Sequence, residues 1–339
     1  MTPDEAARQP MVPGRRGLQI CLGLVWLLDA GLQFQPYMFG PFFVTQGIEL
    51  STAGSPGLVA SSVNWAAQVM LRHIAVYNAI FATIQLLIAG GMFFRRTLKP
   101  ALAASIVWAL FVWWFGESLG GISTGTSPLA GFPGGVILYA LIAVLLWPAD
   151  RTAGRELISP ATSGPLGAIG ANILWLVLWA SFSYSLLLTD NRAPDAIAQV
   201  FSTTDGQPGW LVSMMNGLSS LAGQRGTEIS VALAVACALV AVGVVIRPVI
   251  KPAVAMAIVL ALYFWLAEGL GGIFTGEGTD PNTGPLLILL AACYWPRDTA
   301  RHGVPAVPEG SRSTRLRMAW DKPPLINDSA SASEDASAR

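Results

Sequence analysis

Long apolar runs separated by short polar joints dominate the hydropathy pattern of the chain. There are eight such runs, most of them near the length that crosses a bilayer, and such runs predict helices. They cover residues 17–34, 74–94, 101–114, 136–147, 168–188, 227–246, 253–272 and 285–295. The pattern predicts an all-α fold, specifically a polytopic membrane helix bundle with about eight transmembrane helices.

The fourth and eighth runs are shorter than the others. About twelve apolar residues make roughly 18 Å of helix, against roughly 30 Å of hydrocarbon. Each of these runs must either borrow length from the Gly- and Pro-containing segment before it or re-enter the membrane without crossing.

The second half of the chain repeats the pattern of the first. A twelve-residue stretch starting at Trp114 returns at Trp265, with its Trp, Glu, Leu, Gly-Gly, Ile and Thr-Gly in register. A basic joint at 95–100 returns at 247–252, and a Trp-Pro pair follows both the fourth and the eighth run. Because four crossings return the chain to its starting side, two parallel four-helix repeats are expected.

These features divide the chain into five parts. Residues 35–73 are predicted to form a loop with interfacial helical pieces, the segment that ends at Gly226 is predicted to form a loop, and the C-terminal residues lack periodicity. The parts are a cytoplasmic N-tail (1–16), the first four-helix repeat (17–150), a cytoplasmic linker (151–166), the second repeat (167–298) and a disordered cytoplasmic C-tail (299–339).

Composition supports a membrane protein and excludes several other classes. The chain is 53% hydrophobic and 12% charged with zero formal net charge, which is too apolar for a soluble domain of 339 residues. The expected partners are the lipid bilayer and, as a candidate, a membrane or extracytoplasmic protein, with no nucleic acid. Cys21, Cys237 and Cys293 all lie in apolar runs, so no disulfide framework is expected. No cofactor motif is evident, and the sequence does not decide whether a metal binds.

Lysine and arginine predict the orientation. With a cytoplasmic N-terminus, 17 of the 20 basic residues fall inside and three fall outside, namely Arg72, Arg192 and Arg225. This positive-inside bias places both termini in the cytoplasm and the protein in the cytoplasmic membrane.

Glu117 and Glu268, the acids of the repeated stretch, are the first candidate site residues. Each ends a long apolar run, where an ionisable group costs a few kcal/mol on insertion scales. Small residues bracket both, so helices can approach closely and the two carboxylates could share a proton- or cation-exchange site. The alternative is structural, with each Glu capping backbone NH groups of the following Gly-Gly-Ile turn.

A second candidate cluster belongs to the first half alone. Asp29, Arg72, His73 and Asn78, together with Gln85, are predicted to line one polar cavity that opens outward and ends near Glu117. A structural Asp29–Arg72 ion pair is the alternative. The aligned positions of the second half diverge: Trp179 replaces Asp29, Ser230 replaces Asn78 and Cys237 replaces Gln85.

The loop 277–284 has oxygen-bearing side chains of the kind that Ca²⁺ takes. Its spacing differs from that of an EF-hand, so an Asx turn at Asp280-Pro281 is the preferred interpretation.

Two resemblances add expectations. Residues 85–96, Gln-Leu-Leu-Ile-Ala-Gly-Gly-Met-Phe-Phe-Arg-Arg, resemble the Gly-rich second helix and basic turn of the DoxX/DoxD-like four-helix superfamily. The resemblance implies a four-helix module associated with quinone-linked redox complexes. The whole chain also resembles uncharacterised duplicated membrane proteins of actinobacterial type that carry G-E-x-x-G-G and D-P-N-T-G-P, here at 116–121 and 280–285.

These observations favour an integral membrane protein that binds or transports a small solute or cation through an outward-facing acidic site, and not an enzyme. Two alternatives stay open. One is a cofactor-free membrane subunit of a quinone-linked redox assembly, and the other is a structural scaffold.

Overall fold

The computed structural model describes residues 14–148 and 159–297. These residues form helices and loops without a β-strand. The fold is therefore all-α, as the hydropathy pattern predicts. The C-tail, most of the N-tail and half of the linker lie outside the described residues.

Eight helices match the eight apolar runs to within a few residues at most of their ends. From the first half come α2 (Arg15–Leu32), α4 (Ile74–Phe93), α5 (Leu98–Phe115) and α6 (Gly135–Leu145). From the second half come α7 (Gly167–Leu186), α10 (Gly226–Gly243), α11 (Ile250–Ala267) and α12 (Thr283–Tyr294). The short helices α6 and α12 borrow only one or two residues from the Gly- and Pro-containing segments before them, Gly135 for α6 and Thr283 and Gly284 for α12.

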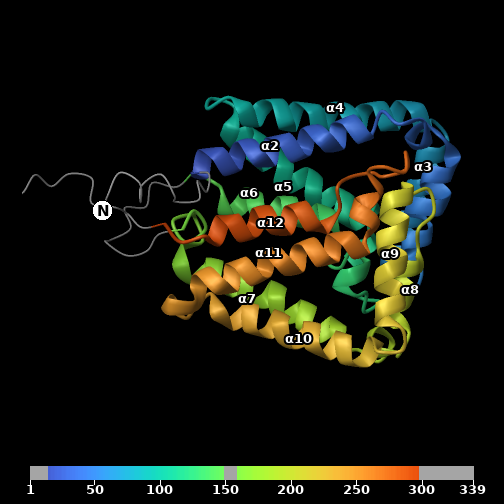
Figure 1. Ribbon diagram of the computed structural model, residues 1–339. Helices are drawn as coiled ribbons and strands as arrows, with labels where there is room; N and C mark the ends of the chain where they lie inside the picture. The colour runs from blue at the N-terminus through green and yellow to red at the C-terminus, as the bar shows by residue number, and fades with distance from the viewer. Residues whose placement is uncertain (1–13, 149–158, 298–339) are drawn as a thin grey trace, which may run out of the picture. The chain divides into compact units, whose positions relative to one another are not determined.

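Further helices in the two long connections lie across one end of the bundle, which we call the loop end (Figure 1). The first connection holds η1 (Pro36–Phe39), η2 (Phe43–Ile48), η3 (Leu50–Thr52) and α3 (Gly57–Leu71). The second holds η6 (Asp190–Arg192), α8 (Ala196–Ser202) and α9 (Gly209–Ala222). Shorter turns follow the third helix of each half: η4 (Ser118–Gly121), η5 (Pro128–Ala130) and η8 (Gly269–Gly272).

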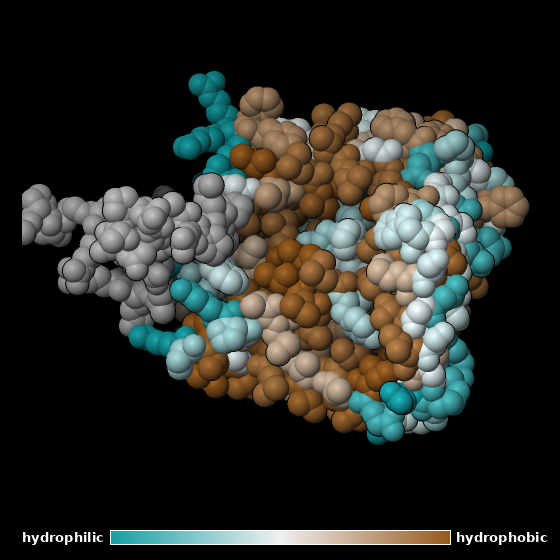
Figure 2. Space-filling view, viewed as in Figure 1, coloured by the Kyte–Doolittle hydropathy of each residue, from teal (hydrophilic) through white to brown (hydrophobic). Residues whose placement is uncertain are grey.

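Five segments are long and apolar enough to cross a membrane: Ile74–Phe93, Leu98–Phe115, Gly167–Leu186, Gly226–Gly243 and Arg247–Ala267. Helix α2 is not among them and carries three charged residues, Arg15, Arg16 and Asp29. Large apolar side chains on these helices point outward, Val107, Leu239 and Val259 being more than 60% exposed. Hydrophobic residues cover much of the helical faces in Figure 2, and hydrophilic residues gather toward the ends. The molecule is thus compatible with insertion into a bilayer.

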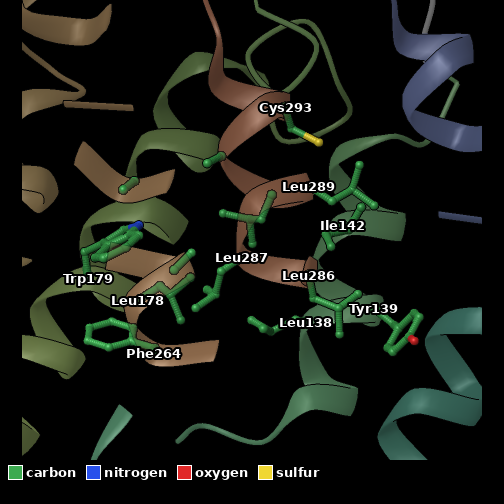
Figure 3. Packing of buried hydrophobic residues seen from close by; sticks show 14 of the residues in the cluster. Leu138, Tyr139, Ile142, Leu178, Trp179, Phe264, Leu286, Leu287, Leu289 and Cys293 are labelled. Carbon is green, nitrogen blue, oxygen red and sulfur yellow. The ribbon is translucent and has the colours of Figure 1, made fainter. Parts of the chain in front are cut away.

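Within each half, neighbouring helices pack antiparallel to each other. The short helices connect the two halves. The most extensive pairs are α2 with α4, α5 with α6, α7 with α10 and α11 with α12. Helices α6 and α12 also contact each other, and Leu138, Ile142, Leu286 and Leu289 are buried there (Figure 3). Because of this contact, residues 14–148 and 159–297 belong to one compact unit.

The end opposite the loop end is held by the N-terminus of α2. Arg15 donates to the Trp147 and Pro160 carbonyls, and Gln19 donates to the Leu146 carbonyl. Arg16 donates to the last carbonyls of α4, at Met92 and Phe93. Cations favour helix C-termini, where carbonyls lack intrahelical partners, so these arginines tie α2 to α4 and α6. We call this the basic end.

Candidate functional site

Each glutamate of the repeated stretch caps the short helix that follows it. Glu117 Oε1 accepts from the Val136 amide at 3.2 Å, in the first turn of α6. Glu268 Oε2 accepts from the Thr283 amide at 3.2 Å, and its Oε1 from the Thr283 hydroxyl, at the start of α12. A carboxylate at a helix N-terminus satisfies free NH groups and complements the helix dipole. The capping alternative is thus close to the observed arrangement, although the NH groups belong to the next helix and not to the Gly-Gly-Ile turn.

A left-handed turn after each glutamate makes this reach possible. Leu119 and Gly120 have φ of 65° and 60°, and Leu270 and Gly271 have φ of 56° and 69°. At Gly120 a Cβ would overlap the Pro133 carbonyl, so glycine is required there both for its conformation and for the close approach. The backbone thereby brings the segment before α6 against the end of α5.

A cavity of about 480 Å³ lies beside Glu117 at the loop end. Its walls come from α2, α3, α4 and α5, with Val136 of α6 and with Thr279 and Asp280 of the loop before α12. Five of its lining side chains carry a carboxyl or amide group: Asp29, Gln33, Gln85, Glu117 and Asp280. The polar groups are acidic or neutral, since the lining contains no Lys, Arg or His.

Asp29 is the most enclosed acid of the cavity. Its side chain is 1% exposed, and its Oδ1 accepts no hydrogen bond from the described residues. The carboxyl lies near the Tyr139 hydroxyl, whose ring packs on Trp26 with centroids 4.1 Å apart. Tyr139 points away from the contact between α6 and α12 (Figure 3). A buried polar atom without a partner costs about 1–3 kcal/mol, so Asp29 indicates a site for something that pairs with it.

Asp280 reaches the same cavity from the second half of the chain. Its Oδ1 accepts from the Asn282 amide at 2.6 Å, which forms an Asx turn, and its Oδ2 accepts from the Thr279 hydroxyl at 3.0 Å. Gln35 donates to the Gly278 carbonyl at 3.2 Å and so joins this loop to the end of α2. The loop is part of the cavity wall and not a separate calcium loop.

Burial perturbs the acids outside the helices. Loss of solvation raises the pKa of Glu117 well above its ordinary value, and the nearby Asp280 raises it further, while the hydrogen bond from Val136 opposes the shift. Burial also raises the pKa of Asp280, against the opposing hydrogen bonds from Asn282 and Thr279. Burial raises the pKa of Glu268 to about 8, although the hydrogen bonds from Thr283 lower it. Perturbed carboxyls in a cavity are the usual setting for proton exchange.

An aromatic wall forms much of the remaining lining. Phe81 and Trp108 have ring centroids 5.2 Å apart, Trp108 and Phe111 5.3 Å, and Phe111 and Phe115 5.0 Å. These four rings run along α4 and α5 and all line the cavity. Trp65 on α3 lines it as well and is 66% exposed, so the cavity reaches solvent beside α3.

The structure brings together only some of the residues expected to form the cluster. Asp29, Gln85 and Glu117 line the cavity. Asn78 is fully buried but donates to the Gln33 carbonyl at 2.7 Å, which fastens the C-terminal end of α2 to α4. It contributes to the frame of the cavity and not to its lining.

Arg72 and His73 do not join the cluster. Both side chains are exposed at the turn between α3 and α4, and neither lines the cavity. The expectation that they line the cavity is therefore wrong, because α3 folds across the loop end and leaves this turn outside. Glu268 also lies outside the lining, bound to α12.

In the second half of the chain, packed side chains occupy the positions aligned with the polar cluster of the first half. Trp179, at the position aligned with Asp29, is completely buried and packs on Trp175 and Phe182, with centroids 5.6 and 5.2 Å apart. Cys237 and Ser230 are buried too, and the Ser230 hydroxyl donates to the Asn191 carbonyl at 2.6 Å. The polar positions of the first half are thus replaced by packing.

Sequence reasoning missed Gln33, the aromatic wall and the part played by Asp280 in the cavity. Gln33 follows α2 directly, and the period of the aromatics at 108, 111 and 115 marks one face of α5, a signal that was present in the sequence. Nothing in the sequence places Asp280 near Glu117, since 163 positions separate them.

Within the described ranges, no three side chains among His, Cys, Asp and Glu are grouped closely enough to hold a metal ion. Comparisons with protein-family models, with curated proteins and with solved structures find no match to this chain.

Proposed function

We propose that the protein is a multi-pass protein of the cytoplasmic membrane that binds a small cationic solute in the acidic cavity and exchanges it across the bilayer. In this proposal eight helices, including α2 and the short α6 and α12, are embedded in the membrane. Both termini are cytoplasmic, so the loop end faces outward. The 17-to-3 distribution of basic residues supports this orientation.

We also infer that the chain consists of two parallel four-helix repeats. Two observations support a duplication. The left-handed turns at Leu119-Gly120 and Leu270-Gly271 have nearly the same dihedral angles. The glutamate before each turn also caps the short helix after it.

The observation that carries the proposed function is the enclosed carboxyl of Asp29. It lies in a cavity with Glu117 and Asp280, and no basic side chain lines that cavity. A buried carboxyl oxygen without a partner is costly, and the unpartnered Oδ1 of Asp29 is best explained by a bound proton or a bound cation. The raised pKa values of Glu117 and Asp280 support an exchange of a bound proton for a bound cation.

Flux measurements in proteoliposomes test the function. Vesicles holding the full-length protein are loaded with a pH-sensitive dye, and candidate cations are added outside with and without an imposed pH gradient. We expect cation-dependent proton movement that Asp29→Asn abolishes. The matched control is Trp179→Phe, at the aligned position of the second half, which should retain most of the flux.

Equal loss in both variants at equal folded yield would contradict a role for Asp29 and favour a scaffold. Uptake of proton-linked anions would contradict the acidic site altogether, because the lining has no group to neutralise them.

A further inference from the structure

The lining of the cavity also indicates which kind of cation it accepts. We propose that the cavity binds a monovalent organic cation, an ammonium group on an apolar or aromatic body, with the charge beside Asp29 and Glu117 and the body against the aromatic wall of α4 and α5. This proposal rests on the proposed function and specifies its ligand.

The volume favours an organic molecule over an ion. A cavity of about 480 Å³ lies within the roughly 300–1,000 Å³ of ordinary small-molecule sites. A metal ion such as Mg²⁺ or Ca²⁺ needs six or more oxygens at about 2.0–2.6 Å. The described part of the chain contains no group of three His, Cys, Asp or Glu side chains that could hold such an ion, although Asp29, Glu117 and Asp280 all line the cavity.

Most of the buried lining atoms that have no hydrogen-bond partner among the described residues are oxygens, and the exception is Trp108 Nε1 in the aromatic wall. Asp29 Oδ1, Gln33 Oε1, Gln85 Oε1 and Glu117 Oε2 are buried and accept no hydrogen bond from the described residues. Asp29, Gln33 and Gln85 are each at most 7% exposed, and all three line the cavity. These oxygens are acceptors, and a ligand that satisfies them must bring donors or positive charge.

The rings of the wall supply the second part of the recognition. Aromatic faces attract cations, with Trp the strongest, at about 0.5–2 kcal/mol per contact depending on solvation. Phe81, Trp108, Phe111 and Phe115 offer four rings in sequence. Such a wall also buries an apolar body. A neutral apolar ligand would leave the acids unpaired, and an anion would be repelled.

Charge balance makes the binding proton-linked. Burial raises the pKa of Glu117 and of Asp280, and the nearby Asp280 raises that of Glu117 further. The titratable groups that face Glu117 are Asp29 on α2, Tyr139 on α6, Asp280 and, more weakly, Glu268. A permanent cation that enters favours the ionised carboxyl, so a carboxyl that holds a proton releases it to solvent as the cation binds.

Calorimetry on the full-length protein in detergent micelles tests the ligand class. The probes are benzyltrimethylammonium, uncharged N,N-dimethylbenzamide, the anion phenylacetate, and sodium chloride. We expect heat of binding for benzyltrimethylammonium alone. The apparent enthalpy should change between buffers of different ionisation enthalpy, because protons are released.

Glu117→Gln and Glu268→Gln form a matched pair for locating the site. Both remove an acid that caps a short helix, but only Glu117 lines the cavity. Glu117→Gln should weaken benzyltrimethylammonium binding by about tenfold or more and reduce the released protons, while Glu268→Gln keeps wild-type affinity. Trp108→Leu should weaken binding by about tenfold and Trp108→Phe by less.

The remaining outcomes distinguish the two proposals. Binding of sodium without benzyltrimethylammonium would overturn the ligand class and leave the acidic site in place. Equal weakening by Glu117→Gln and Glu268→Gln would overturn the location. Binding of dimethylbenzamide as strongly as of the cation, or of none of the four probes by folded protein, would overturn both this inference and the proposed function.

Discussion

At the scale of single residues, the same glutamate in two copies of a motif has two different surroundings. Both carboxyl oxygens of Glu268 accept hydrogen bonds from Thr283, one from its amide and one from its hydroxyl. Glu117 Oε1 accepts from the Val136 amide, and Oε2 has no partner within hydrogen-bond geometry among the described residues. Position 283 explains the difference, because the helix that Glu117 caps begins with glycine and valine, which offer no hydroxyl. Glu117 therefore retains capacity for a ligand.

Glu268 should make the stability of the protein depend on pH. Its pKa of about 8 in the folded state lies above the ordinary 4.5, so the folded state binds the proton more tightly than the unfolded state. The stabilisation is complete below about pH 4.5 and is lost as pH rises through 8. The negative charge of the neighbouring acids Glu117 and Asp280 also favours the protonated form of Glu268. The Glu268→Gln variant has no carboxyl to ionise at this position. The difference in melting temperature, variant minus wild type, should therefore increase by several degrees between pH 5 and pH 9.

Glu277→Gln is the control for this measurement, since Glu277 is an exposed acid of the same loop. Its melting temperature should follow wild type across the range. Parallel curves for wild type and Glu268→Gln would show that Glu268 stays ionised in the folded protein.

The surroundings of a side chain could be predicted where the neighbouring residues in the sequence determine them. They could not be predicted where tertiary packing determines them. The enclosure of Asp29 follows from an acid within an apolar run, which the sequence displays. The exposure of Arg72 and His73 depends on the direction in which α3 crosses the loop end, and no local pattern encodes that. Asp280 joins the cavity only because α12 packs against α2 and α6.

At the scale of elements, the turn between α5 and α6 depends on glycine. A side chain at Gly120 would overlap the Pro133 carbonyl and would have to adopt φ near +60°. The segment that Glu117 must reach would then be pushed away from it, and the cap of α6 would be lost. The cost combines the strain of a left-handed residue, about 1–3 kcal/mol, with a lost cap of about 1 kcal/mol.

We therefore expect Gly120→Ala to reduce the folded yield severalfold and to lower the melting temperature. Gly217→Ala is the matched control, because Gly217 lies within α9 and a Cβ there meets nothing within 4 Å. That variant should be as stable as wild type or more stable, by up to about 1 kcal/mol. Size-exclusion yield and thermal melting compare the two directly.

Helices were the most predictable level of the structure. Their positions follow from long apolar runs, and each run ends at residues that stop helices, such as the Pro148 and Pro296 that follow tryptophan. Helix α3 was expected only as an interfacial piece, and α8 and α9 were not expected, because the second connection was predicted to be a loop. The role of α3 as a cover over the cavity comes from tertiary contacts, among them the hydrogen bond from Trp114 Nε1 to the Ser62 hydroxyl at 3.0 Å.

At the scale of the whole molecule, the orientation in the membrane can be tested by labelling. Cys21, Cys237 and Cys293 are first replaced by serine or alanine. Single cysteines are then introduced at Ser123 and Thr97, which are exposed at the loop end and in the basic joint respectively. An impermeant maleimide added to intact cells should label Ser123→Cys and leave Thr97→Cys unlabelled until the membrane is opened. Labelling of Thr97→Cys alone would reverse the proposed orientation.

The shortness of α6 and α12 has an electrical consequence. With 11 and 12 residues they are roughly 16–18 Å long, about half the hydrocarbon thickness of a bilayer. In the proposed orientation, water that enters the cavity brings the outside potential down to the acids, and most of the membrane voltage falls across the remaining dry layer. A single positive charge that crosses this layer gains about 2.3 kcal/mol per 100 mV in a cell with a negative interior. The field at the foot of the cavity is then steeper than in the surrounding lipid, and the voltage draws a cation held at Asp29 toward the basic end.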